Sequence, residues 1–193
     1  MMPLNYALTD GLVALVAAWG GWRLLRSGRP VAAMGMALFS IAGAIGTVRI
    51  TLGLGEQLAA AHRFASQVGG VAGVTLFLSQ IVREAGWPHP ALASAFAAIV
   101  AAAVMMLAPG AGAILFVLAI ISGTALLWRG NGPESRNIIG ALGFAVMLAN
   151  ALLVRKSTWL GADASWHVYH CLVALWLTAF TATLIARPLP AQR

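Results

Sequence analysis

Seven apolar runs, each close to the length that crosses a lipid bilayer, make up most of this chain of 193 residues. About twenty consecutive apolar residues cross the hydrocarbon core as an α-helix. Only 9% of the residues are charged, whereas a soluble domain has about a quarter. The sequence therefore predicts an all-α fold, a polytopic membrane helix bundle that forms a single transmembrane domain over residues 1–193. The expected spans are 8–27, 31–54, 62–82, 91–108, 111–128, 137–154 and 165–186.

Short breaks that contain glycine and proline separate the runs, as turns require. Only Pro109 and Gly110 separate the fourth run from the fifth. We interpret these two runs as a tight helical hairpin, which gives seven transmembrane helices; one interrupted segment would give six. We expect Glu56 and Glu84 in loops, and His89 at the surface of its own loop.

The basic residues predict the orientation of the chain. With the N-terminus outside, eight arginines lie in cytoplasmic segments and four basic residues lie outside, as the positive-inside rule favours. The cytoplasmic set is Arg23, Arg26, Arg29, Arg83, Arg129, Arg136, Arg187 and Arg193, and the outer set is Arg49, Arg63, Arg155 and Lys156. We therefore predict a protein of the cell inner (plasma) membrane with its C-terminus in the cytoplasm. Arg155 and Lys156 run against the rule.

The position of the positive charges bears on two further expectations. The positive charges nearest the N-terminus follow the first apolar run instead of preceding it, so this run is interpreted as a retained span and not as a signal peptide. The net charge of +7 is dispersed over the ends of the runs. This distribution excludes nucleic acid as a partner and indicates contact with anionic membrane lipids. The bias toward Ala, Gly and Leu suggests a bacterial source.

Polar residues in three runs share helical faces with small residues, because positions i, i+4 and i+7 lie on one side of a helix. Small residues let helices approach closely, so we expect these faces to point into the bundle. All three groups would then lie at one depth near the outer leaflet. The groups are Asp163, His167 and His170 in the last run, His62 and Ser66 with Gly69 and Gly73 in the third, and Asp10 with Ala14, Ala17 and Gly21 in the first.

Two carboxylates, three imidazoles and a hydroxyl are compatible with four kinds of site. Zinc takes nitrogen and oxygen ligands and activates a bound water. A pair of neutral histidines holds haem iron in other proteins, and carboxylates with imidazoles relay protons in transporters. The fourth is a polar knot without a ligand, in which Asp163 hydrogen-bonds His167 and fixes the register of the helices. Cys171 is rotated away from the His170 face and is not counted as a ligand.

The stretch Ser165-Trp166-His167-Val168-Tyr169-His170-Cys171-Leu172 opens the last run. Together with the seven spans, it resembles the superfamily of alkaline ceramidases, progestin and adipoQ receptors, and related membrane hydrolases. In that family three histidines hold a zinc ion, two from an HxxxH in the last span and one from an earlier span. An aspartate and a serine near the metal assist the hydrolysis of an amide or ester. In this chain the two histidines are three residues apart instead of four.

The resemblance implies an intramembrane zinc-dependent hydrolase of lipid amides or esters. His62, His167 and His170 would ligate the zinc. Asp10, Asp163 and Ser66 would be the catalytic groups. A relative that kept the fold and lost the metal is an equal alternative. From the residues alone, the second hypothesis is a non-enzymatic membrane carrier or assembly subunit, in which the same residues form a pocket for a lipid or small molecule.

Overall fold

The computed structural model describes residues 3–87, 91–129, 134–155 and 157–188, so the expected positions of His89 and Lys156 lie outside the described residues. Within those ranges every regular element is a helix, which confirms the all-α class. The elements are α1 (Asn5–Arg26), α2 (Pro30–Thr51), α3 (Ala59–Glu84), α4 (Ala91–Leu107), α5 (Pro109–Trp128), α6 (Glu134–Ala149), the π-helical turn η1 (Asn150–Val154) and α7 (Gly161–Ile185).

Glycine and proline mark several helix boundaries. Gly28, Gly53 and Gly86 follow the ends of α1, α2 and α3 with φ of 76°, 65° and 94°. Glycine adopts this left-handed conformation without a steric penalty and commonly stops a helix there. Pro30 and Pro109 begin α2 and α5, where a missing N–H leaves no hydrogen bond unmade. Pro109 therefore starts a new helix, and the fourth and fifth apolar runs are two helices, not one interrupted segment.

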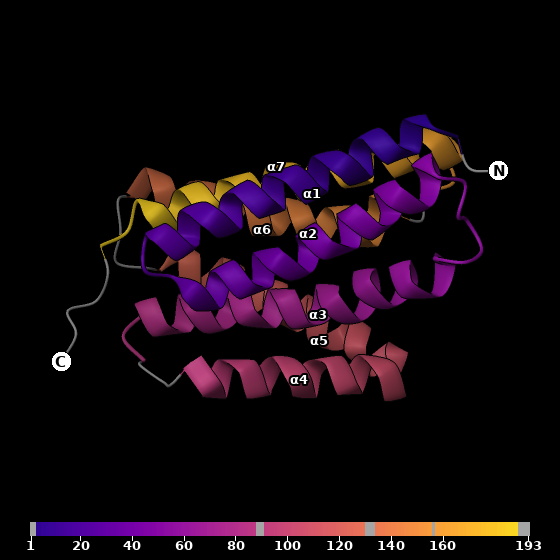
Figure 1. Cartoon of the computed structure of the whole chain (residues 1–193). Helices are drawn as coiled ribbons and strands as arrows, with labels where there is room; N and C mark the ends of the chain where they lie inside the picture. Colours follow the sequence, from indigo (N-terminus) through magenta and orange to yellow (C-terminus); the bar gives the residue numbers. More distant parts are fainter. Residues whose placement is uncertain (1–2, 88–90, 130–133, 156, 189–193) are drawn as a thin grey trace.

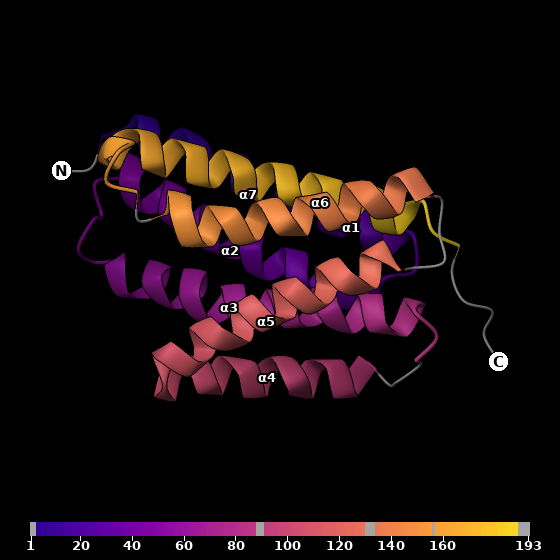
Figure 2. The same ribbon diagram turned by 180° about the vertical axis from the view of Figure 1, so that it is seen from behind.

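Six of the helices form a closed ring and α4 lies outside it. Around the ring α1 packs on α2, α2 on α3, α3 on α5, α5 on α6, α6 on α7, and α7 on α1. The fourth helix packs on α3 and α5 at one edge of the bundle (Figures 1 and 2). The start of α1 and the end of α7 lie at opposite ends of the bundle (Figure 1), as an odd number of consecutive antiparallel helices requires. We call the end near the N-terminus the pocket end.

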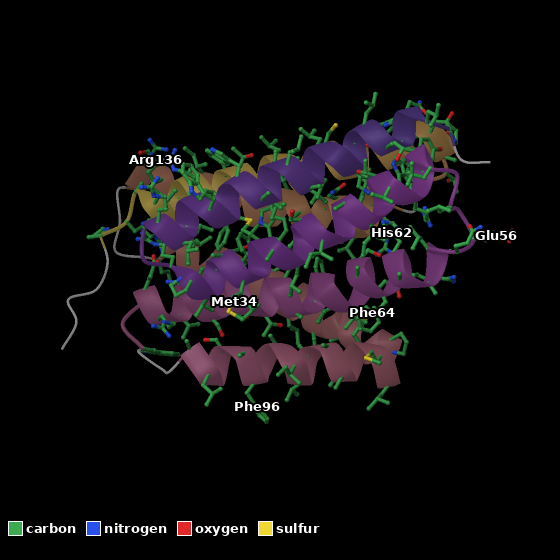
Figure 3. All side chains as sticks on the ribbon, viewed as in Figure 1. Met34, Glu56, His62, Phe64, Phe96 and Arg136 are labelled. Carbon is green, nitrogen blue, oxygen red and sulfur yellow. The ribbon has the colours of Figure 1, made fainter. Side chains whose placement is uncertain are left out.

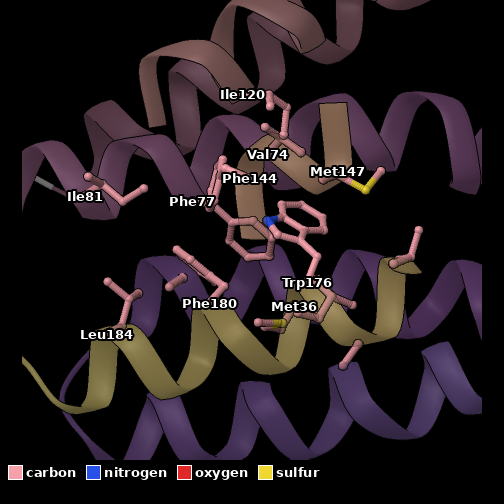
Figure 4. Close-up of a cluster of buried hydrophobic side chains, with 14 of the residues drawn as sticks. Met36, Val74, Phe77, Ile81, Ile120, Phe144, Met147, Trp176, Phe180 and Leu184 are labelled. Atoms are coloured by element: carbon pink, nitrogen blue, oxygen red, sulfur yellow. The ribbon is translucent and has the colours of Figure 1, made fainter. Parts of the chain in front are cut away.

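An aromatic cluster fills the middle of the ring (Figure 4). Trp176 of α7 is 1% exposed, and its ring centroid lies 5.5 Å from Phe39, 5.5 Å from Phe77 and 5.4 Å from Phe144. Their planes cross at 81°, 70° and 84°, the edge-to-face geometry that aromatic pairs prefer. Because the four rings come from α2, α3, α6 and α7, the cluster joins both sides of the ring.

Glycines allow α2 and α3 to approach closely beside this cluster. A Cβ atom on Gly73 would lie 2.8 Å from Phe39 Cε2 and 3.2 Å from the Gly35 carbonyl oxygen. A Cβ on Gly35 would in turn lie 2.9 Å from the Gly73 carbonyl oxygen. The predicted inward face of Gly73 is therefore confirmed.

In the described part of the chain, five helices are long and apolar enough to cross a membrane: α2, α3, α5, α6 continued by η1, and α7. A sixth, α4, is apolar but has 17 residues. It turns large apolar side chains away from the bundle, among them Phe96, which is 67% exposed (Figure 3). The first helix has 22 residues. Its first turns hold Asn5, Thr9 and Asp10, which lower its hydropathy and, as described below, contact α7.

Buried polar side chains join the helices at the end opposite the pocket. Arg29 Nε lies 2.7 Å from Glu84 Oε1, and both side chains are 2% exposed. The same guanidinium donates to the carbonyl oxygen of Arg187 at 2.6 Å, and Arg187 donates to Asn137 Oδ1 at 2.6 Å. Gln80 also donates to Glu84 Oε1, at 3.0 Å. Glu84 is thus the last residue of α3 and part of a buried ion pair, so the expected loop position of Glu84 is wrong.

Candidate functional site

A cavity of about 430 Å³ lies at the pocket end of the bundle. His62, which lines it, stands near this end of α3, whereas Arg136 marks the opposite end (Figure 3). The walls come from α1, α2, α3 and α7 and from the segment that joins η1 to α7. The lining residues are Asp10, Val13, Phe39, Ala42, Gly43, His62, Ala65, Ser66, Gly70, Arg155, Ser157, Ala162, Ser165, Trp166, Tyr169, His170 and Val173.

Asp10 and His170 form the innermost polar contact of this cavity. Asp10 is 1% exposed, and its Oδ1 lies 3.0 Å from His170 Nε2. The other ring nitrogen of His170, Nδ1, donates to the carbonyl oxygen of Trp166 at 2.8 Å. A carbonyl oxygen only accepts, so Nδ1 must carry a hydrogen. Asp10 Oδ1 and His170 Nε2 are close enough to hydrogen-bond through one proton, so the pair is placed to donate or accept a proton.

The second carboxylate oxygen of Asp10 faces His62. Oδ2 is buried without a hydrogen-bond partner among the described residues, and His62 Nε2 lies 3.9 Å away, beyond hydrogen-bond distance. Gly46 of α2 makes room for this approach. A Cβ there would lie 2.0 Å from Asp10 Oδ2 and 2.8 Å from His62 Nε2. Asp10, His62 and His170 thus meet from three helices around a carboxylate oxygen with spare accepting capacity.

His167 faces α1 but belongs to a different contact. Its Nε2 lies 3.1 Å from the Asn5 side-chain amide, which donates to it. Its Nδ1 lies 3.3 Å from Thr9 Oγ1, and Thr9 in turn donates to the carbonyl oxygen of Tyr6. A neutral imidazole with its hydrogen on Nδ1 satisfies all of these contacts. The Nε2 lone pair is then in use, so His167 has no nitrogen to offer to an ion shared with His62 and His170.

Asp163 is likewise held by α1. The Tyr6 hydroxyl donates a short hydrogen bond to Asp163 Oδ1. The Tyr6 ring also stacks on Trp166, with centroids 4.8 Å apart and planes at 14°. Asp163 therefore has Tyr6 as its partner in place of the His167 that a polar knot would require.

Ser66 lines the cavity at its exposed side, and its hydroxyl donates to the carbonyl oxygen of Arg63 in its own helix at 3.2 Å. Of the six residues proposed from the sequence, the structure brings together Asp10, His62 and His170. Ser66 lies in the same wall. Asp163 and His167 are on the expected face of α7, but their contacts lie beside the cavity.

Three residues in or beside the cavity were not among those proposed from the sequence. Gly46 leaves space between Asp10 and His62, and its position three residues after Gly43 in α2 could have indicated a close crossing. Arg155 lies over Tyr169, with its guanidinium carbon 5.9 Å from the ring centroid. The sequence could have indicated Arg155, because it is one of the two outer basic residues that disagree with the positive-inside rule. Gly70 is buried beside the cavity, and no sequence pattern separates it from Gly69.

His167, one of the three zinc ligands that the resemblance implies, is not placed with His62 and His170 in this structure. Among the described residues, no group of three or more His, Cys, Asp or Glu side chains is arranged to hold a metal ion. His167 is turned to Asn5 and Thr9, as described above. The remaining cluster combines one carboxylate and two imidazoles, which is a set suited to transferring protons.

No protein-family model, curated protein or solved structure matches the chain. The site and the fold therefore carry the functional argument by themselves. They define a bundle of apolar helices with a cavity at one end, in which a buried carboxyl group lies between two imidazoles.

Proposed function

We propose that the protein is a seven-span protein of the inner membrane, with the pocket end outside and the C-terminus in the cytoplasm. Five helices long and apolar enough to cross a membrane support this proposal, as do the eight arginines expected on one side and the four basic residues on the other. In α1, the polar residues Asn5, Thr9 and Asp10 contact histidines of α7, which removes the main obstacle to placing this helix in lipid. The cavity then lies in the outer half of the bilayer.

The proposed activity is hydrolysis of a lipid ester or amide in this cavity. One observation carries the proposal: a buried carboxyl group lies 3.0 Å from His170 Nε2 through one oxygen, and its other oxygen has no hydrogen-bond partner among the described residues. Such a group can both supply and accept a proton. General acid and base groups within reach of a reacting bond contribute about 10²–10⁴-fold to the rate of such reactions.

The roles of the three residues follow from their hydrogen-bonding capacity. A water held by Asp10 Oδ2 would lose a proton to His62 Nε2 as it attacks the carbonyl carbon, and this proton would afterwards pass back to the Asp10–His170 pair. The proton shared by Asp10 and His170 would move to the leaving oxygen or nitrogen as the ester or amide bond breaks. The fatty acid and the released alcohol or amine account for all atoms of the lipid and the water. His170 is held in position by Trp166, and Gly46 maintains the approach of the other two residues.

A metal ion has no step in this proposal, because His167 is engaged elsewhere. The zinc hypothesis nevertheless makes a distinct prediction. If three histidines held a metal, His167→Gln would abolish hydrolysis as fully as His170→Gln, and the purified protein would contain about one zinc per chain.

The second candidate function is a non-enzymatic carrier or binding protein. It is favoured by Ser66, whose hydroxyl donates to the backbone of its own helix and is not activated by a base among the described residues. Without an activated serine, the same cavity would bind a lipid and release it unchanged.

Hydrolysis of a panel of lipid esters and amides by the purified protein in nanodiscs tests the proposal. Activity is expected in the parent and in His167→Gln, the matched control one turn away on α7. It should fall by about 10²-fold or more in His170→Gln and Asp10→Asn. Activity that is unaffected by these two substitutions would contradict the assigned roles. Binding of panel lipids without any turnover would favour the carrier.

A further inference from the structure

The cavity changes in chemical character from its rim to its floor. Arg155 and Ser157 stand at the rim, beside the start of α7, and Asp10 lies in the middle. Phe39 and Val173 line the inner part and adjoin the aromatic cluster of the bundle core. This order, from basic through acid–base to apolar, matches an amphiphile lying lengthwise in the cavity.

Gly70 marks the inner part on the α3 side. It lies eight residues after His62, which corresponds to about 12 Å along a helix. Gly70 is buried, yet a Cβ added to it would meet no atom within 4 Å. Its missing side chain therefore opens onto the space of the cavity, in contrast to Gly73 one turn further, which is pressed against α2.

The charges of the lining residues indicate which polar end the cavity accepts. Asp10 already has the imidazoles of His170 and His62 beside its carboxyl group. Arg155 is the other charged residue in the lining, and no carboxylate in the described part of the chain forms an ion pair with it. Its guanidinium lies over the Tyr169 ring, an arrangement that leaves N–H donors free at the guanidinium edge. The rim is therefore suited to an anion.

We infer that the ligand is a single-chain acyl amphiphile with an anionic end, bound with its chain toward Gly70 and its anion at Arg155. The inference rests on the proposed function and specifies its substrate class: the acyl ester or amide bond would lie beside Asp10 and His170, with the negative charge on the leaving group. A volume of about 430 Å³ is near the lower end of the range of ligand pockets, about 300–1,000 Å³. It has room for one chain and a small polar group, and not for a two-chain lipid.

Binding of acylglycines to the full-length protein, in nanodiscs of phosphatidylcholine, tests the orientation. Dodecanoylglycine should bind the parent, and Arg155→Gln should weaken it by on the order of tenfold. Dodecanoylglycinamide, which has no charge, should bind the parent and Arg155→Gln equally. Arg63→Gln, which changes a basic residue outside the cavity lining, is the matched control and should leave both affinities unchanged.

A second variant tests where the end of the acyl chain lies. Gly70→Leu adds a side chain to open space and is expected to fold, because leucine also favours a helix more than glycine does. It should weaken hexadecanoylglycine by on the order of tenfold and leave octanoylglycine unchanged. Gly69→Ala, whose Cβ would make only an ordinary contact with Leu38 at 3.8 Å, is the control.

The outcomes separate this inference from the proposed hydrolysis. No binding of any acylglycine to the parent would overturn the inference, as would an equal effect of Arg155→Gln on the charged and uncharged ligands. If Gly70→Leu weakened the binding of long-chain and short-chain acylglycines equally, the assigned direction of the acyl chain in the cavity would be overturned. Binding with both expected selectivities but without release of glycine would sustain the inference and contradict the hydrolase.

Discussion

Asp10 Oδ1 lies 3.0 Å from His170 Nε2, while the opposite nitrogen of the same ring donates to the carbonyl oxygen of Trp166. The backbone of α7 thereby fixes the ring so that Nε2 is directed at the carboxyl group of α1. The pair links the two helices, and in the proposed reaction a proton between Nε2 and Oδ1 passes to the leaving group.

Substitutions of Asp10 separate these two roles. Asp10→Asn keeps the shape and can donate from its amide to His170 Nε2, so the free energy of unfolding should change by less than about 1 kcal/mol. Asp10→Ala leaves the buried imidazole nitrogen without a partner and should cost about 1–3 kcal/mol. Both variants should lose hydrolysis. Unfolding in detergent, followed by circular dichroism, measures the first effect. An alanine variant as stable as the parent would mean that the contact does not link the helices.

Gly46→Ala tests the space between Asp10 and His62. The added Cβ would lie 2.0 Å from Asp10 Oδ2, so one or both side chains must move. Because Asp10 is buried, this overpacking should lower the free energy of unfolding by about 1–3 kcal/mol, and hydrolysis by the folded protein should fall at least tenfold. Gly69→Ala is the matched control, because it makes the same chemical change outside the cavity lining, where the added Cβ would meet Leu38 only at 3.8 Å. Equal activities of the two variants would show that the proximity of Asp10 and His62 is not needed.

The fold followed from the sequence because its determinants are local. Apolar runs, glycines after helices and prolines at helix starts each act within a few residues. They predicted the seven α-helices that the described residues form, and Pro109 was the correct boundary between α4 and α5. The expected burial of Gly73 against another helix also rests on a local pattern, a stripe of small residues in α3.

The site could be predicted from the sequence only in part. Helical phase gives the direction in which a side chain points, but not the residue that it contacts. Helical phase correctly predicted that Asp163, His167 and His170 face a neighbouring helix. About 60° separates His167 from His170 on that face, and this is enough to place one beside Asn5 and the other beside Asp10. Which neighbour each histidine meets depends on the rotation of α1, which no local pattern specifies.

The same limit explains the error at Glu84. At the end of α3 and before a glycine, a glutamate has the sequence features of an exposed loop residue. Its burial depends on Arg29, which comes 55 residues earlier in the chain. Long-range pairing of this kind cannot be predicted from composition or periodicity.

The Arg29–Glu84 pair gives a prediction about stability. Removing one partner of a buried ion pair costs about 3–5 kcal/mol, because the other charge stays buried and unpaired. Arg29→Met should therefore destabilise the bundle strongly, and Arg29→Met combined with Glu84→Met should be less harmful than Arg29→Met alone. Arg26→Gln, at an exposed position in the last turn of α1, should change stability by no more than about 0.5 kcal/mol. Additive effects of the two methionine substitutions would contradict a coupled pair.

Reporter fusions test the proposed orientation, on which the location of the cavity depends. An odd number of spans places the two chain ends on opposite sides of a membrane, and the basic residues favour the C-terminus inside. A reporter that is active only outside the cytoplasm should work at the N-terminus and fail after Arg193, and a cytoplasmic reporter should show the reverse. Both ends on one side would mean that a helix does not cross, and α4, with 17 residues, would be the first candidate. An inverted result at both ends would keep seven spans but place Arg155 and the cavity in the inner leaflet.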